Sequence, residues 1–281
     1  MPLSAFPYPG GKTVYHGEIL QYFPDHRRYV EPFGGGAALL LNKPKSYMEI
    51  YNDLDDDVVH FFEVLRDRRE ELEQWVENVP YSRAVYEEWV SEFYTGHRPE
   101  DDIERAGRWF YLRYSQFNGS LDRRNGFKTG GKRNEARSFR GSIDDLETIA
   151  SRLREVTIEC QSYDQVLDRY DHPDTLFYLD PPYYDTDRPH YRVGKEFDHD
   201  RFVDELRDRD GYWIVSYGEL PPGLADVATT VEDYTARYSM AYSEDRPAHT
   251  EHVAMNFDPA EAPPFTPAGQ TTFGEVTATD D

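Results

Sequence analysis

The chain has 281 residues, a formal net charge of −23 and a single cysteine, Cys160. One cysteine excludes an intramolecular disulfide, and no apolar run reaches the length that a membrane-spanning helix needs. The length suits one substantial domain, or a core domain that carries a smaller insert. The first residues lack the apolar stretch of a signal peptide, so we expect a cytoplasmic protein with no membrane partner.

The acidity of the chain bears on its partners, because a typical nucleic-acid-binding domain is basic. Asp and Glu together number 54, against 31 Lys and Arg. Only six of the basic residues are lysines, namely Lys12, Lys43, Lys45, Lys128, Lys132 and Lys195. Abundant carboxylates with few lysines are typical of a halophilic archaeon or its virus, and we expect such an origin. The alternative is that the acidity excludes nucleic acid altogether.

The first predicted elements alternate between strand and helix. Residues 29–31 are predicted to form a strand, residues 32–36 a glycine-rich turn and residues 37–42 a helix. A second strand is predicted over residues 47–51. The next helix has an apolar stripe at helical spacing, made of Val58, Phe61, Phe62 and Leu65. This alternation predicts a parallel sheet that is covered by helices.

The middle of the chain departs from this alternation. Residues 69–117 are predicted to be mostly helical and polar, whereas regular periodicity stops over residues 118–142. Another helix is expected at about 143–155. The large aromatic residues of this region, Trp75, Trp89, Trp109 and Tyr111, are expected to anchor the helices in a core.

The sheet pattern then resumes. Short strands are predicted at residues 157–160, 176–179 and 212–217, followed by an antiparallel pair at 237–242 and 252–257. The sequence therefore predicts an α/β fold with a discontinuous sheet domain, residues 1–68 and 143–258, split by a helical insert, residues 69–142. The tail, residues 259–281, is rich in Pro, Thr and acidic residues and is predicted to be disordered.

The strongest local signal is Asp180-Pro181-Pro182-Tyr183, which directly follows an apolar strand. In open α/β sheets the ligand lies beyond the carboxyl ends of the strands. The prolines stiffen the loop, Asp180 supplies an acceptor and Tyr183 supplies a flat face. These groups suit an exocyclic aromatic amine. Asp180 and the Pro181 carbonyl can accept hydrogen bonds from its two N–H groups. The amine lone pair is then directed at an incoming electrophile, and this orientation of the amine accelerates the reaction.

Three weaker signals precede this loop. The turn Phe33-Gly34-Gly35-Gly36 allows a ligand to approach the backbone closely. Asp53 ends the second strand, where an acid can accept the ribose hydroxyls of a nucleoside. Tyr8 and Lys12 flank a Pro-Gly-Gly turn and can supply an aromatic face and a cation. The neighbouring acids Asp55, Asp56 and Asp57 are expected to be solvated charges at the start of a helix.

In this combination and order the motifs resemble the Dam-type, D12 class of DNA adenine N6-methyltransferases. Further similar stretches are residues 117–119, 216–217 and 251–257. The resemblance implies a Rossmann-like, S-adenosylmethionine-dependent methyltransferase sheet with a helical target-recognition insert. It also implies direct in-line methyl transfer to N6 of an adenine flipped out of double-stranded DNA. Ala37 departs from the family, which usually has a glycine there.

The resemblance assigns roles to individual residues. The implied cofactor site consists of Tyr8, Lys12, Phe33, Gly34, Gly35, Asp53 and Asp180. The implied catalytic residues are Asp180, Pro181, Pro182 and Tyr183, with Tyr183 stacked on the target base. No metal is expected, because the nine histidines show no ligand spacing.

A basic segment, residues 123–140, interrupts the acidic chain. It contains Arg123, Arg124, Lys128, Lys132, Arg133, Arg137 and Arg140, and its only acid is Glu135. Because the segment falls where the family has its recognition insert, we expect it to contact DNA. The predicted contacts are Asn118, Arg123, Arg124, Lys128, Lys132 and Arg133. The alternative is a basic loop that is salt-bridged to the acidic surface.

Other functions compete with adenine methylation. N4-cytosine methylation would use an amine of the same geometry, and RNA methylation is a further possibility. A non-catalytic DNA-binding relative would keep the fold without turnover. C5-cytosine methylation is disfavoured because Cys160 lies outside any Pro-Cys loop. A cognate restriction endonuclease that acts on the same site is the expected partner if the protein serves in restriction-modification.

Overall fold

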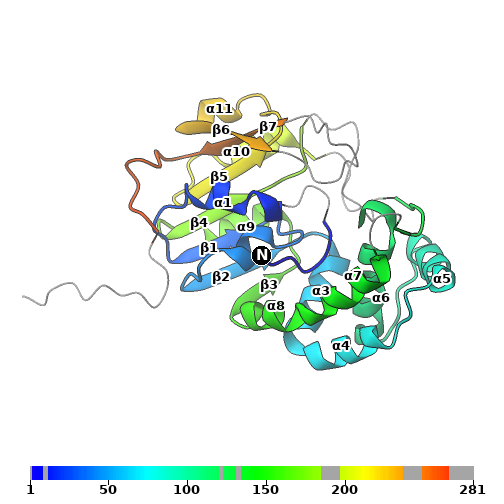
Figure 1. Ribbon diagram of the computed structural model, residues 1–281. Helices are drawn as coiled ribbons and strands as arrows, with labels where there is room; N and C mark the ends of the chain where they lie inside the picture. Colours follow the sequence, from blue (N-terminus) through cyan, green and yellow to red (C-terminus); the bar gives the residue numbers. More distant parts are fainter. Residues whose placement is uncertain are drawn as a thin grey trace, which may run out of the picture.

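The computed structural model describes residues 2–8, 12–119, 123–130, 134–184, 197–236 and 249–265, which form one sheet flanked by helices (Figure 1). The strands are β1 (Arg28–Glu31), β2 (Met48–Asn52), β3 (Val156–Glu159), β4 (Thr175–Leu179), β5 (Tyr212–Tyr217), β6 (Thr230–Ala236) and β7 (His249–Met255). The helices are the 3-10 helices η1 (Lys12–Val14) and η2 (Phe117–Gly119), and α1 (His16–Leu20), α2 (Ala38–Asn42), α3 (Asp56–Asp67), α4 (Arg69–Glu77), α5 (Arg83–Tyr94), α6 (Asp102–Ser115), α7 (Glu135–Asp144), α8 (Leu146–Leu153), α9 (Tyr163–Tyr170), α10 (His199–Glu205) and α11 (Leu224–Val227).

The sheet has seven strands in the order β3-β2-β1-β4-β5-β7-β6. Strands β1 to β5 are parallel, and β7 runs antiparallel to both β5 and β6. The chain moves outward from β1 to β3 and then returns to place β4 on the other side of β1. Strand order therefore reverses between β1 and β4, and such a switch point is where open α/β sheets bind their ligands. The predicted α/β fold is confirmed.

The side chains of the sheet alternate between two hydrophobic clusters, one on each face. Along β4, Leu176 and Tyr178 join the cluster beneath α1 to α8, whereas Phe177 and Leu179 join the cluster beneath α9, α10 and α11. All five residues of β4 are buried. A central parallel strand with both faces covered is expected to be apolar throughout.

The helical insert shares its core with the sheet domain. The Phe61 ring of α3 stacks on Phe110 of α6 at a centroid distance of 5.4 Å and an angle of 2°. Gly107 allows Trp75 of α4 to approach closely, because a Cβ at residue 107 would lie 2.3 Å from the indole. Trp109 and Tyr111 are fully buried and Trp89 packs on the same cluster, so the predicted aromatic anchors are confirmed.

Several predicted elements need correction. The inner strand of the antiparallel pair is β7, and its outer partner is β6, residues 230–236, whereas the strand expected at 237–242 lies outside the described residues. The helix expected at about 143–155 is confirmed as α8, whereas the stretch 118–142, expected to be irregular, contains most of helix α7. The short sequence segments of α9, α10 and α11 gave no periodic signal long enough to predict them.

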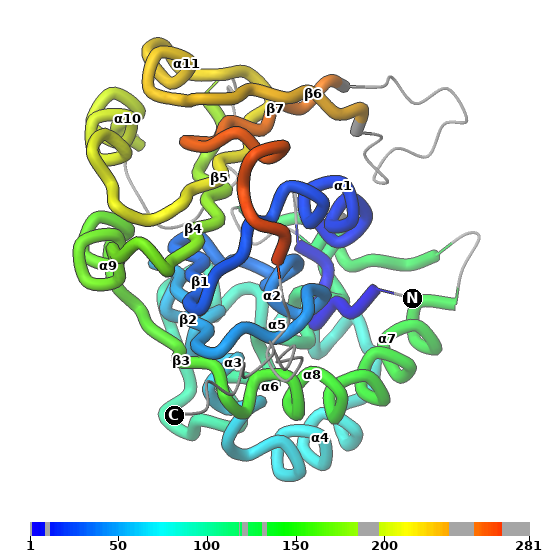
Figure 2. The backbone as a smooth tube through the Cα atoms, turned by 90° about the vertical axis from the view of Figure 1, so that its left-hand side faces the viewer, coloured from blue at the N-terminus to red at the C-terminus, as the bar shows by residue number. Residues whose placement is uncertain are grey.

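The tail was expected to be disordered from residue 259, and this is wrong for residues 259–265. Pro264 forms an antiparallel bridge with Pro24, and the Asp25 N–H donates to the Pro263 carbonyl at 2.6 Å. Phe265 stacks on His26 at 4.3 Å. Figure 2 shows this orange segment running back from β7 past β1 and α1. Phe265 thus packs on a residue more than 200 positions earlier in the chain, a contact that the local sequence does not indicate.

The acids at the start of α3 are not equivalent, and the expectation that all are solvated is wrong for Asp57. The Asp57 side chain is 3% exposed and pairs with Arg98 at 2.8 Å and with Arg105 at 2.9 Å. Asp56 is 72% exposed and meets Arg105 at 2.6 Å. Because Arg98 and Arg105 come from the insert, Asp57 ties the insert to α3.

We therefore predict that Asp57→Ala lowers the free energy of unfolding by about 3 kcal/mol, because Arg98 loses its carboxylate partner in a largely buried place, while Arg105 keeps Asp56. The matched variant Asp56→Ala should cost less than about 1 kcal/mol, since its carboxylate is exposed. Urea denaturation of both variants measures the difference. Equal losses would show that Asp57 does not hold the insert.

Candidate functional site

Three predicted motifs meet at one edge of the sheet. The glycine-rich turn follows β1, Asp53 follows β2 and Asp180 follows β4. Because β2, β1 and β4 are adjacent and parallel, their carboxyl ends lie side by side at the switch point. The fold thus brings together residues that are up to about 150 positions apart in the sequence.

The glycine-rich turn is fixed by the end of β2. The Gly34 N–H donates to the Asn52 carbonyl at 2.7 Å, and the Gly35 N–H donates to Asp53 Oδ2 at 2.8 Å. The Tyr51 hydroxyl donates to the Gly35 carbonyl at 2.8 Å. A Cβ at residue 34 would lie 2.2 Å from the Tyr51 ring, and Gly35 has a φ of +45°. Both positions therefore require glycine.

A buried carboxylate supports the helix that follows this turn. Glu31 Oε1 accepts the Tyr29 hydroxyl at 2.6 Å and the Leu40 N–H at 2.8 Å, within the first turn of α2. Burial raises the pKa of Glu31 to about 7. Ala37 precedes α2 with a left-handed φ of 54° and offers no side-chain cap. This conformation explains why a glycine suits the position better than alanine.

Asp53 is already engaged by the backbone. Besides Gly35, the Asp55 N–H donates to its Oδ1 at 2.8 Å. Burial raises the pKa of Asp53 to about 6, while the hydrogen bonds from Asp55 and Gly35 oppose the shift. The carboxyl is therefore mostly ionised at neutral pH. Because the backbone N–H groups of Gly35, Leu54 and Asp55 already reach it, the carboxylate keeps about one lone pair with which to accept a hydroxyl.

Tyr8 lies over the glycine-rich turn. A Cβ at Gly35 would lie 2.8 Å from its ring, and one at Gly36 would lie 3.2 Å from its Cβ. The Arg113 guanidinium lies 4.7 Å from the Tyr8 ring centroid, and Arg113 Nη2 donates to the Pro7 carbonyl at 2.7 Å. Arg113 is only 4% exposed. It thus holds the segment that presents Tyr8.

Sequence reasoning missed Arg113. It follows Trp109 by four positions and so falls on the buried stripe of α6. A basic residue on an apolar stripe is the signal that could have identified it, since such a charge needs a specific partner when buried.

Around Asp180 a compact polar network forms. Lys12 Nζ donates to Asp180 Oδ1 at 3.0 Å and to the Tyr183 hydroxyl at 2.5 Å. The same ammonium lies 3.7 Å from Glu251 Oε2 and is 4% exposed. Burial raises the pKa of Asp180, and the ammonium of Lys12 opposes the shift. Lys12 therefore contacts the predicted catalytic loop as well as belonging to the predicted cofactor site.

The remaining loop residues lie between these groups. Pro181 is buried, and Pro182 and Tyr183 are half-buried. The Tyr183 ring lies close to Gly218, where a Cβ would be 3.1 Å away, and 5.9 Å from the Tyr217 ring centroid. The loop is therefore packed on the end of β5, which limits how its aromatic face can turn.

Phe33 points to a different set of neighbours. It stacks on Tyr163 of α9 at 5.3 Å and meets Phe197 and Phe202 edge-on at 5.7 and 5.9 Å. These aromatic neighbours were not anticipated, because the helices that carry two of them were not predicted. Phe33 thus packs against the α9 and α10 side of the sheet, away from Tyr8.

In the described part of the basic segment, some of the basic side chains form ion pairs with acidic residues of the insert. Arg124 Nη2 lies 2.7 Å from Glu87, and Lys128 Nζ lies 3.0 Å from Glu135. Arg123 is exposed. This pairing matches the salt-bridged alternative for two of the predicted DNA contacts. Asn118 belongs to η2, and Lys132 and Arg133 lie outside the described residues.

Gly119, which precedes the basic segment, lies beside residues 2–8, the N-terminal strip. A Cβ at Gly119 would lie 2.9 Å from the Pro7 side chain and 3.0 Å from the Arg113 carbonyl. Gln116 and Phe127 form an isolated bridge that closes the loop between them. The basic segment is therefore joined to the same strip that carries Tyr8.

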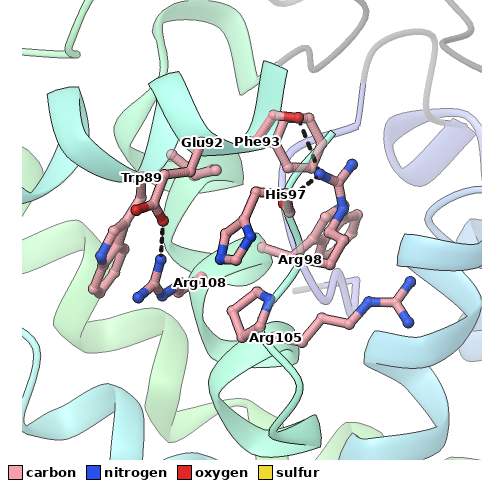
Figure 3. A pocket seen from close by; sticks show the side chains of 10 residues that line it. Trp89, Glu92, Phe93, His97, Arg98, Arg105 and Arg108 are labelled. Atoms are coloured by element: carbon pink, nitrogen blue, oxygen red, sulfur yellow. Dashed lines mark hydrogen bonds and ion pairs between the residues drawn. The ribbon is translucent and has the colours of Figure 1, made fainter. Parts of the chain in front are cut away.

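A separate small cleft lies within the insert (Figure 3). Its lining includes Trp89, Phe93, Arg98, Arg105 and Arg108. The guanidinium groups already meet carboxylates, as in the pair of Arg108 with Glu92. The cleft therefore belongs to the scaffold of the insert.

Among the described residues, no group of three or more His, Cys, Asp or Glu side chains is arranged to hold a metal ion. Within that same part of the chain, none of the helices is both long and apolar enough to cross a membrane.

The sequence matches a known family over most of its length. The profile described as "D12 class N6 adenine-specific DNA methyltransferase" matches residues 8–215. This span includes the glycine-rich turn, Asp53, the insert and the loop at Asp180.

Individual relatives agree with this match. A type II methyltransferase, M.CviBI, of Paramecium bursaria Chlorella virus NC1A is 27% identical over 196 residues, which cover 67% of this chain and 73% of the relative. A type II methyltransferase, M.MjaIII, of Methanocaldococcus jannaschii is 25% identical over 63% of this chain and 67% of the relative. A DNA N-6-adenine-methyltransferase of Escherichia phage P1 is 26% identical over 64% of this chain but only 24% of that longer protein.

The glycine-rich turn generates a prediction about stability. Gly34→Ala should lower the free energy of unfolding by about 2 kcal/mol or more, because the new methyl group collides with Tyr51. Gly141→Ala is the matched control, since Gly141 lies in α7 and a Cβ there would meet none of the described residues within 4 Å. The control should stabilise the protein by up to about 1 kcal/mol through helix propensity. Chemical denaturation measures both, and a neutral Gly34→Ala would refute the close contact.

Proposed function

Because the chain belongs to the D12 class of N6 adenine-specific DNA methyltransferases, we propose that it uses the loop Asp180-Pro181-Pro182-Tyr183 to methylate N6 of adenine in double-stranded DNA. The methyl donor in this proposal is S-adenosylmethionine. The family match favours adenine over the N4-cytosine and RNA alternatives. The α/β sheet is consistent with an S-adenosylmethionine-dependent methyltransferase.

One observation carries the assignment of the loop. Asp180 ends the strand beside the switch point, and its carboxylate is held by the buried ammonium of Lys12 at 3.0 Å. An acceptor that is fixed in a water-poor site needs no reorganisation when it receives the amine of a base. The two prolines that follow it keep the backbone carbonyl of Pro181 in a defined direction.

The residues around the turn fit the proposed methyl donor. The glycines at residues 34 and 35 leave the backbone open, and Asp53 keeps a lone pair for a ribose hydroxyl. Tyr8 offers a ring beside the turn, and Lys12 offers an ammonium toward the donor's carboxylate. When bound, S-adenosylmethionine supplies an electrophilic methyl group on a sulfonium. The carboxylates of Asp53 and Asp180 suit this cation electrostatically.

The protein's part in the transfer is orientation. Asp180 and the Pro181 carbonyl accept the two N–H bonds of the target amine, which turns its lone pair toward the methyl group. Tyr183 stacks on the adenine, which must first leave the duplex to reach the loop. As the amine gains a methyl group, it becomes cationic, and Asp180 stabilises that charge and is placed to receive the proton.

DNA is held by the basic segment in this proposal. Arg123 and Arg124 are exposed at its start, and a nearby phosphate can compete with Glu87 for Arg124. An exposed ion pair contributes at most about 1 kcal/mol, so it can be exchanged at small cost. Asn118, Lys128, Lys132 and Arg133 are the remaining proposed contacts. Because two relatives are named type II methyltransferases, we further propose a cognate restriction endonuclease as functional partner.

The first test is to express the protein in a host with unmethylated DNA and to sequence that DNA for modified bases. We expect N6-methyladenine at one short recurring motif, and none in cells that express Asp180→Asn. The variant keeps the size of the side chain but removes the charged acceptor. N4-methylcytosine, or continued methylation by a folded Asp180→Asn protein, would contradict the proposal.

The DNA contacts are tested by the double variant Arg123→Ala/Arg124→Ala. We expect weaker DNA binding, with a salt dependence whose slope falls by up to about 2 because two phosphate contacts are lost. The matched control is Arg169→Ala/Arg207→Ala, which removes the same charge from exposed arginines elsewhere. Fluorescence anisotropy over a KCl series measures both. If the two variants behave alike, the effect is net charge and the basic segment does not contact DNA.

A further inference from the structure

Glu251 lies at the centre of the polar network, but it is not among the residues to which the sequence assigns a catalytic or cofactor-binding role. We propose that Glu251 is a positioning residue for methyl transfer, which holds the hydroxyl of Tyr183 and so fixes the ring that stacks on the target base. This inference rests on the proposed function of the loop. It assigns a role to the antiparallel strand β7, which lies outside the part of the chain that the family profile matches.

Glu251 is buried, and its carboxylate contacts two tyrosine hydroxyls and one ammonium group. It is 1% exposed. Its Oε2 accepts the Tyr183 hydroxyl at 2.6 Å and the Tyr234 hydroxyl at 3.3 Å, and lies 3.7 Å from Lys12 Nζ. A buried carboxylate is costly unless such partners satisfy it. The shortest of these contacts is the one to the catalytic loop.

The direction of the hydrogen bonds at Tyr183 follows from the chemistry of its partners. The ammonium of Lys12 can only donate, so the Tyr183 oxygen accepts from Lys12. The proton of the hydroxyl is then shared between two carboxylates, Glu251 at 2.6 Å and Asp180, both of which can only accept. Lys12, Tyr183 and Glu251 thus form one ordered chain, and the removal of Glu251 takes away one of the two carboxylates that receive the hydroxyl proton.

One further contact, with Gly218, restrains the ring of Tyr183 together with these hydrogen bonds. Gly218 borders one side of the Tyr183 ring, where a Cβ would be only 3.1 Å away. The Glu251 and Lys12 bonds hold the far end, at the hydroxyl. A ring fixed at both places loses little further freedom when a base stacks on it, which is the benefit of preorganisation.

The sheet explains how Glu251 reaches the loop. In the antiparallel register Glu251 faces Tyr234 of β6, and its neighbour His252 faces Tyr217 at the end of β5. Glu251 therefore lies next to the strand end on which Tyr183 packs. Lys12 and Asp180 complete the group, so a local charge of one cation and two carboxylates is buried there.

The test is a double-mutant cycle between Glu251→Gln and Tyr183→Phe, read as single-turnover methyl transfer at saturating DNA and S-adenosylmethionine. Each single variant should slow transfer about 10- to 100-fold, the range for a lost hydrogen bond to a charged group. The double variant should be no slower than the slower single variant. Dissociation constants for S-adenosylmethionine and DNA should stay within about threefold of the wild type, because the hydroxyl acts on the ring and not on affinity.

A matched control comes from the same carboxylate. Tyr234→Phe removes the longer hydrogen bond to Glu251 but leaves Tyr183 in place, so its transfer rate should stay within about threefold of the wild type. Thermal melting shows whether each variant is folded. If Glu251→Gln does not fold, Glu251→Asp replaces it in the cycle, since it keeps the charge but withdraws the acceptor from the hydroxyl.

Three results would overturn the inference. They are an unchanged rate in a folded Glu251 variant, a loss that adds in full to that of Tyr183→Phe, and a loss confined to S-adenosylmethionine binding. Failure of the proposed function has a separate signature, since the wild type itself would then transfer no methyl group to adenine.

Discussion

The ammonium group of Lys12 joins three segments that are far apart in the sequence. It reaches Asp180 after β4 and Glu251 on β7, and it donates to Tyr183 between them. In a region of low dielectric, these charges depend on each other, because any one left alone would carry a large desolvation cost. The loop, the helix η1 that begins at Lys12 and the antiparallel strand therefore hold one another in place.

The glycine-rich turn and Asp53, the proposed cofactor side of the site, hold each other in a similar way. Asp53 accepts the N–H of Gly35, while Tyr51 and Asn52 fix the rest of the turn. The carboxylate thus shapes the turn and still has acceptor capacity. Because the glycine at residue 34 lies against Tyr51, the turn cannot tolerate a larger residue. Packing against Tyr51 and the proposed access of a ligand to the backbone both require a glycine at residue 34.

The insert is not an independent appendage. Phe110 stacks on Phe61, and Arg98 and Arg105 pair with Asp57, so the insert shares both apolar and ionic contacts with α3. Arg113 extends this connection to the strip that carries Tyr8. If the insert contacts DNA, as proposed, its DNA-binding surface is therefore connected to the site through packed side chains.

The sequence by itself determined the α/β class, the glycine-rich turn, Asp53 and the loop at Asp180, because strand periodicity and glycine and proline chemistry are local properties. It also indicated the family through the order of these motifs. Only the tertiary structure decided that Lys12 pairs with Asp180, that Glu251 and Arg113 belong to the site, that Asp57 is buried, and that residues 259–265 pack beside β1. These features depend on strand order and on contacts across long sequence distances, and of them only Arg113 has a local signal, its position on the buried stripe of α6.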